Sequence, residues 1–276
     1  NREGTDYSNE GGWYDANLIR FRKGLPEKIG GWEKLTSNTY LGIGRALHGW
    51  VDLAATKLLG LGTTYKYYIE SGNAFNDVTP IRSTTSAGDV TFSATDGDAT
   101  LTVTDASNGS VQNDFVTFSG AASLGGLITA DVLNQEYQIA TIVSANSYTV
   151  EAKDTDGDTV TANSSDSGNG GSSVVGAYQI NVGLDVYVPS SGWGANPWGD
   201  GGWGSTSTIS DTNQLRIWTH DNFGEDEVMN PRAGGIYYWD TSAKTLGTDR
   251  AVSFSDLSGA NLPPTKALQI LVSDID

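Results

Sequence analysis

The chain of 276 residues contains no cysteine, which excludes disulfides, thiolate metal sites and a thiol nucleophile. Basic residues are also scarce, because 16 Lys and Arg stand against 33 Asp and Glu, giving a formal net charge of -17. A surface this acidic repels phosphate, which argues against sequence-specific nucleic-acid binding and against adsorption to anionic lipid. No apolar run approaches the roughly 20 residues that cross a bilayer, and no signal peptide is visible.

Glycine is abundant, with 35 residues against only 7 prolines, and Thr, Ser and Val are frequent. This composition is typical of short strands joined by tight turns and predicts an all-β fold. We expect hairpins over residues 17–32, with a turn at 24–26, and over residues 58–70. Residues 100–104 alternate strictly between polar and apolar side chains. We expect one short helical turn over residues 45–53. A final strand is expected over 267–272, and because it reads as the middle of a sheet we expect a longer parent polypeptide.

Charge divides the chain into residues 1–82, 83–190 and 191–276, and we predict domains over residues 1–82, 83–175 and 176–276. Only Lys153 is basic between residues 83 and 190, against thirteen acids. We interpret residues 83–175 as an inserted small β-sandwich or barrel that ends in a Ser/Gly-rich linker. The flanks share an echo, since Tyr67-Tyr68-Ile69-Glu70 resembles Tyr237-Tyr238-Trp239-Asp240. This echo favours one repeating, β-propeller-like domain, incomplete in this chain, that the insertion interrupts.

Two acidic segments invite a chemical interpretation. Asp154-Thr155-Asp156-Gly157-Asp158 has the alternating carboxylates of a calcium loop, but Ser165 stands where an EF-hand needs Glu, so a hairpin turn is the favoured interpretation. Glu225-Asp226-Glu227 is the densest carboxylate cluster, which we predict to be a solvated loop rather than a glycosidase pair. The two histidines, His48 and His220, show no zinc spacing, and no Gly-x-Ser-x-Gly motif supports a serine nucleophile.

Three tryptophans, Trp193, Trp198 and Trp203, lie five residues apart and each precedes a glycine. Exposed indole rings in such a segment suit contact with a partner protein or a glycan. The alternative is a Gly-rich loop whose rings fold back onto the β core. We favour the core interpretation and keep the three residues as candidate contact residues.

The flanking parts contain a recognisable set of motifs, Arg20-Phe21-Arg22-Lys23-Gly24-Leu25-Pro26, Gly30-Gly31-Trp32, Arg45-Ala46-Leu47-His48-Gly49-Trp50, Lys66-Tyr67-Tyr68-Ile69-Glu70 and Gly234-Gly235-Ile236-Tyr237-Tyr238-Trp239-Asp240. In these motifs the chain resembles structural proteins of short-tailed bacteriophages, in the tail nozzle or tail-hub family. The resemblance implies a β-propeller assembled as a ring of six in the virion tail. It also implies contacts with an adaptor above and with tip or fibre proteins, and DNA passing through the ring as non-specific cargo. No catalytic residue, metal or cofactor carries over, because the family is structural.

Two rival functions remain open. The first is a carbohydrate-binding module or adhesin that uses the Gly/Trp segment as its platform. The second is a glycan-degrading enzyme that uses Glu225 or a neighbouring acid, for which the sequence offers no positive sign.

Overall fold

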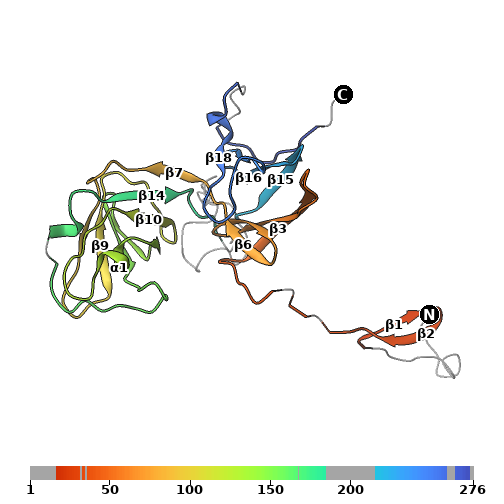
Figure 1. Ribbon diagram of the computed structural model, residues 1–276, viewed down its shortest axis with the longest axis horizontal. Coiled ribbons are helices and arrows are strands. Elements are labelled where there is room, and N and C mark those ends of the chain that lie inside the picture. The colour runs from red at the N-terminus through yellow and green to blue at the C-terminus, as the bar shows by residue number, and fades with distance from the viewer. Residues whose placement is uncertain are drawn as a thin grey trace, which may run out of the picture. The chain divides into compact units, whose positions relative to one another are not determined.

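The computed structural model describes residues 17–31, 33–34, 36–166, 168–184, 215–259 and 265–273. The chain divides into two compact units between Ser37 and Asn38. It is all-β, with several antiparallel sheets and short helical segments, and no helix in the described ranges is long and apolar enough to cross a membrane (Figure 1). The all-β prediction is therefore confirmed.

In the first unit, β1 (Ile19–Arg22) and β2 (Leu25–Lys28) form the predicted hairpin. The turn is shorter than expected, because Arg22 pairs directly with Leu25. Lys23 and Gly24 both have positive φ, 51° and 82°, which is the backbone of the two-residue turn that matches strand twist.

The second unit contains two sheets of four strands in which each strand pairs with the next along the chain. The first sheet consists of β3 (Gly44–Val51), β4 (Lys57–Thr63), β5 (Tyr67–Ser71) and β6 (Ala74–Asp77). The second consists of β15 (Trp218–Phe223), β16 (Asp226–Pro231), β17 (Tyr237–Trp239) and β18 (Val252–Ser253). We call these the first and second meander sheets.

The predicted helical turn over residues 45–53 is wrong, because this segment is strand β3. Trp50 is buried and His48 half-buried, whereas Leu47 and Val51 are exposed, so burial follows the two-residue period of a strand. Pairing with β4 along its length fixes this conformation.

Two expectations near the C-terminal end are also corrected. Asp226 and Glu227, predicted to lie in a loop, begin strand β16 instead. Residues 267–272 form no strand and contribute only an isolated bridge between Gly234 and Ala267. Backbone amides of Ile270 and Val272 donate instead to side chains of β15.

The sequence echo falls on equivalent strands. Tyr67 begins β5 and Tyr237 begins β17, and each strand is third in its meander sheet. Ile69 and Trp239, two residues further along, are both buried. The short repeat therefore marks a structural repeat of one four-stranded unit.

The two meander sheets share one hydrophobic core. Its buried members are Trp50, Leu58, Tyr67, Ile69, Val78, Ile180, Trp218, Met229, Trp239 and Ala251. Two glycines of β4 allow the two meander sheets to approach each other closely. A Cβ on Gly60 would collide with Tyr67 Oη and Glu227 Oε1, and one on Gly62 would collide with the Trp218 ring. Trp218 also donates from Nε1 to the carbonyl of Thr63, at 2.8 Å.

Residues between the meander sheets form two further four-stranded sheets. One contains β7 (Ile81–Thr84), β10 (Phe115–Ser119), β11 (Glu136–Gln138) and β14 (Val175–Gln179), and the other β8 (Thr91–Ser93), β9 (Thr100–Thr104), β12 (Thr141–Ser144) and β13 (Ser147–Glu151). Helix α1 (Ala130–Leu133) lies between β10 and β11 in the chain, and its Val132 and Leu133 are buried in the core of the sandwich. Phe92 and Phe118, one from each sheet, meet edge to face at 4.9 Å, so the sheets enclose a core of their own.

Strands β7 and β14 of the sandwich pair with each other and extend side by side toward the meander sheets (Figure 1). The chain thus enters and leaves the sandwich at neighbouring points. Part of the Ser/Gly-rich run contacts the sandwich, since Ala162 and Val174 are buried in its core. The domain boundaries at residues 82 and 175 stay a prediction.

Alanine at Gly60 or Gly62 is expected to destabilise the fold by about 1–3 kcal/mol, the typical cost of overpacking a core. Gly49→Ala is the matched control, because its Cβ would meet neighbours only at ordinary contact distances of 3.9 and 4.0 Å. Urea unfolding of the three variants checks this. Equal midpoints for Gly62→Ala and Gly49→Ala would contradict the close packing.

Candidate functional site

An ionic cluster around Lys66 joins the meander sheets to the sandwich. Lys66, between β4 and β5, is only 2% exposed, and its Nζ lies 2.6 Å from both Asp77 Oδ2 and Glu136 Oε2. Asp77 ends β6 and Glu136 begins β11 of the sandwich. Arg250, before β18, places Nη1 at 2.5 Å from Asp77 Oδ1. The four side chains, here called the Lys66 junction, come from both meander sheets and the sandwich.

Charges in the Lys66 junction balance, with two cations against two carboxylates. Gln179 of β14 adds a hydrogen bond from Nε2 to Glu136 Oε1, at 2.5 Å. Burial alone raises the pKa of Asp77, but Lys66 and Arg250 outweigh it and lower that pKa below its usual value. Removing one partner of such a buried network commonly costs about 3–5 kcal/mol, because the other charge is left buried.

A second polar cluster lies between the meander sheets at Glu227. Glu227 is fully buried in β16, and its Oε1 accepts a hydrogen bond from the Tyr67 hydroxyl. His220 Nδ1 lies 2.5 Å from that hydroxyl and 3.5 Å from Glu227 Oε1. The His48 ring lies 5.1 Å from the His220 ring, and His48 Nε2 lies 2.5 Å from Asn222 Oδ1. Both histidines therefore belong to one inter-sheet network.

The predicted solvated loop at residues 225–227 is wrong for Glu227, because β16 turns this side chain into the inter-sheet core. Burial raises the pKa of Glu227, against hydrogen bonds from His220 and Tyr67 that lower it. Glu225 accepts from the Leu53 amide at 3.0 Å and Asp226 from the Thr241 amide at 2.8 Å. All three carboxylates thus accept hydrogen bonds from the surrounding structure, and their arrangement is not that of a glycosidase pair across a cleft.

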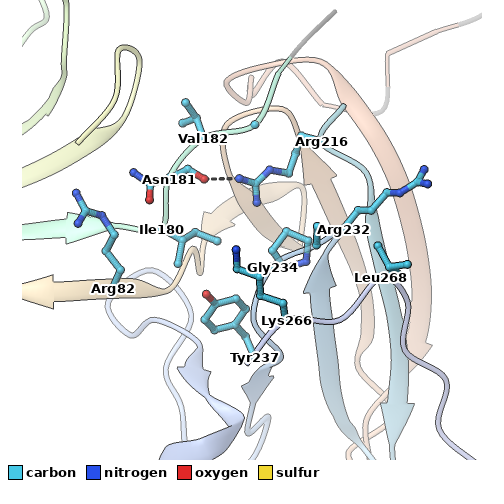
Figure 2. Close-up of a pocket in the computed structure, with 13 residues that line it drawn as sticks. Arg82, Ile180, Asn181, Val182, Arg216, Arg232, Gly234, Tyr237, Lys266 and Leu268 are labelled. Atoms are coloured by element: carbon cyan, nitrogen blue, oxygen red, sulfur yellow. Dashed lines mark hydrogen bonds between the residues drawn. The ribbon is translucent and has the colours of Figure 1, made fainter. Parts of the chain in front are cut away.

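A basic pocket of about 630 Å³ lies where the end of β14 meets the second meander sheet (Figure 2). Among the described residues that line it, four side chains are cationic, Arg82, Arg216, Arg232 and Lys266, and none is a carboxylate. Tyr237, Ile180 and Leu268 supply aromatic and apolar surface. Arg82 and Lys266 are 184 residues apart in the sequence (266 − 82), so it is the tertiary fold that brings the four cations together.

The candidate contact residues Trp193, Trp198 and Trp203 lie outside the described residues, so that prediction stays open. The Asp154 segment forms a hairpin turn. Asp154 Oδ1 accepts from the amides of Asp156 and Asp158, at 3.0 and 2.9 Å. Gly157 has φ of 90°, as the turn requires. Across the described ranges, no group of three His, Asp or Glu side chains is placed to hold a metal ion.

Comparisons with known proteins give little further guidance. No protein-family model matches the sequence, and no curated protein matches it. Among solved structures, the endosialidase of phage phi92 is similar at 14% identity and a TM-score of 0.26. The match covers 83% of this chain and 32% of that one. Likeness at this level supports no conclusion about fold or activity.

Replacing Glu227 with Gln is expected to change how stability depends on pH. Because its folded pKa is raised, the folded protein holds a proton that the unfolded chain releases above about pH 4.3. Stability of the wild type therefore falls as pH rises from there to the folded pKa, by up to about 1.4 kcal/mol per pH unit.

Glu227→Gln lacks this proton, so its stability relative to wild type should rise across the same window. Denaturant unfolding between pH 4.5 and 7.5 measures it, with the exposed Glu151→Gln as control for loss of a carboxylate. A constant difference between Glu227→Gln and wild type over the whole range would contradict the raised pKa.

Proposed function

We propose that this protein is a structural subunit of a bacteriophage tail, in the nozzle or hub ring through which DNA is ejected. The observation that carries the proposal is the repeat of two four-stranded meander sheets around one shared core. Consecutive four-stranded antiparallel sheets are the blades of a β-propeller. The repeat supports the propeller architecture that the resemblance to short-tailed phage proteins implies, and three of the motifs behind that resemblance occupy β3, β5 and β17.

Exposed apolar side chains on the first meander sheet support assembly. Leu47 and Val51 on β3 are 67% and 54% exposed, and Leu53 just beyond is 88% exposed. Strand β3 is also an edge strand, with one row of backbone groups unpaired within its sheet. Such an edge is a ready pairing surface, and we propose that a neighbouring subunit covers it.

Charge is compatible with a DNA channel. The sandwich carries exposed acids, and the whole chain has a formal net charge of -17. The exposed acids of the sandwich are Asp89, Asp96, Asp98, Asp131, Glu151, Asp156 and Asp158. A negative wall repels phosphate, so DNA slides past it without binding.

Light scattering or native mass spectrometry of the purified protein tests the assembly. We expect a discrete particle near six times 29.1 kDa. Leu47→Glu should reduce it to single chains without unfolding them, because it places a charge in the proposed contact while Leu47 contributes little to the core.

Leu127→Glu is the matched control, since Leu127 is similarly exposed, at 53%, but lies on the sandwich. A wild-type particle of one chain, or an oligomer that Leu47→Glu leaves intact, would contradict assembly through β3.

A further inference from the structure

The basic pocket has a charge opposite to that of the whole protein. Four of the 16 basic residues line it, within a chain whose formal net charge is -17. Concentrating cations at one concave site costs mutual repulsion, which an anionic occupant relieves. The pocket is also large enough, at about 630 Å³, to enclose a small molecule rather than a bare ion.

Arg216 forms the fixed inner wall of the pocket. Its guanidinium donates to the carbonyl of Asn181 and lies 5.6 Å from the Trp218 ring centre. Gly183 makes room for it, because a Cβ there would collide with the Arg216 side chain. Burial lowers the pKa of Arg216 to about 10, which still leaves it positive at neutral pH. One hydrogen bond to a carbonyl leaves most of its five donors available.

Lys266 provides a second, exposed cation. In Figure 2 its amine extends toward Ile180 and the Arg216 guanidinium, whereas Arg232 points away from them. Arg82 is already engaged, since it donates to Gln179, Asn108 and Ser110. Among the salt bridges of the described residues, none includes Arg216 or Lys266.

One carboxylate, Asp114, lies behind the pocket, where it forms an ion pair with Arg82 and its charge also acts on Arg216. It is fully buried and lies 4.0 Å from Arg82 Nη2. Its oxygens also accept from Asn181 Nδ2 at 2.5 Å and from the Val182 amide at 2.8 Å. Asp114 therefore braces the segment behind the pocket, and the side chains that face the cavity stay cationic.

We propose that this pocket binds a small organic anion, in which a carboxylate or phosphate group on a compact hydroxylated body meets Arg216 and Lys266. Charge-assisted hydrogen bonds from these two side chains hold the anionic group. The Tyr237 hydroxyl lies in the lining to meet a hydroxyl group, and Ile180 and Leu268 cover the apolar face of the body. This site is independent of ring assembly and goes beyond the proposed function.

Calorimetric titration of the full chain tests the site with four probes: glucuronate, glucose 6-phosphate, inorganic phosphate and neutral glucose. Glucuronate and glucose 6-phosphate compare a carboxylate with a phosphate on a similar sugar. Inorganic phosphate tests the charge without the sugar, and glucose tests the sugar without the charge. Lys266→Gln removes the exposed cation. Lys57→Gln is the control, because Lys57 is exposed on β4 and does not line the pocket.

Saturable binding of glucuronate or glucose 6-phosphate is expected, with no response to glucose at the same concentrations. Lys266→Gln should weaken that binding about tenfold, the loss typical of one charge-assisted hydrogen bond, while Lys57→Gln leaves it unchanged. Equal affinity for glucose, equal losses in the two variants, or no saturable binding of either anionic sugar would overturn the proposal. A response to inorganic phosphate alone would assign the pocket to an adventitious ion only and would overturn it too.

Discussion

A single buried ammonium group, Lys66 Nζ, holds carboxylates from two parts of the chain that otherwise fold around separate cores. Asp77 belongs to the first meander sheet and Glu136 to the sandwich, and both lie 2.6 Å from it. Arg250, which precedes β18 of the second meander sheet, forms an ion pair with the same Asp77. In a low-dielectric setting these charges are stable only together, so the junction restricts how the three parts meet.

The meander sheets depend on a further constraint, the absence of side chains at Gly60 and Gly62. These glycines let Trp218 and Glu227 approach β4 closely. The Tyr67, His220 and Glu227 network then pairs Glu227 Oε1, whereas Glu227 Oε2 is buried without a hydrogen-bond partner in the part of the chain that the structure describes. Together these contacts join the two meander sheets closely through side chains of the described residues.

Local signals in the sequence predicted much of the β structure. Residues 100–104 alternate and form β9, and Gly24 marks the first hairpin turn. The echo at Tyr67 and Tyr237 identified equivalent strands because inward aromatic positions recur in repeated sheets. Such patterns are visible because a strand places alternate side chains on opposite faces.

The junction and the pocket could not be predicted in this way. The residues next to Lys66 in the sequence do not indicate that it is buried, and its ionic partners are 11 and 70 residues away. Glu225 to Glu227 looked solvated because sequence shows carboxylates together but not which one β16 turns inward. The pocket cations come from four separate segments, which only tertiary folding places side by side.

Hydrogen exchange of Lys66→Met against wild type tests the central claim, that one ionic junction joins the three parts. The account predicts that amide protection falls together in β5, in β11 and β14, and around β18, while the exposed Lys57→Met leaves all of them unchanged. Loss of protection confined to the turn between β4 and β5, with the sandwich and second meander sheet unaffected, would contradict it.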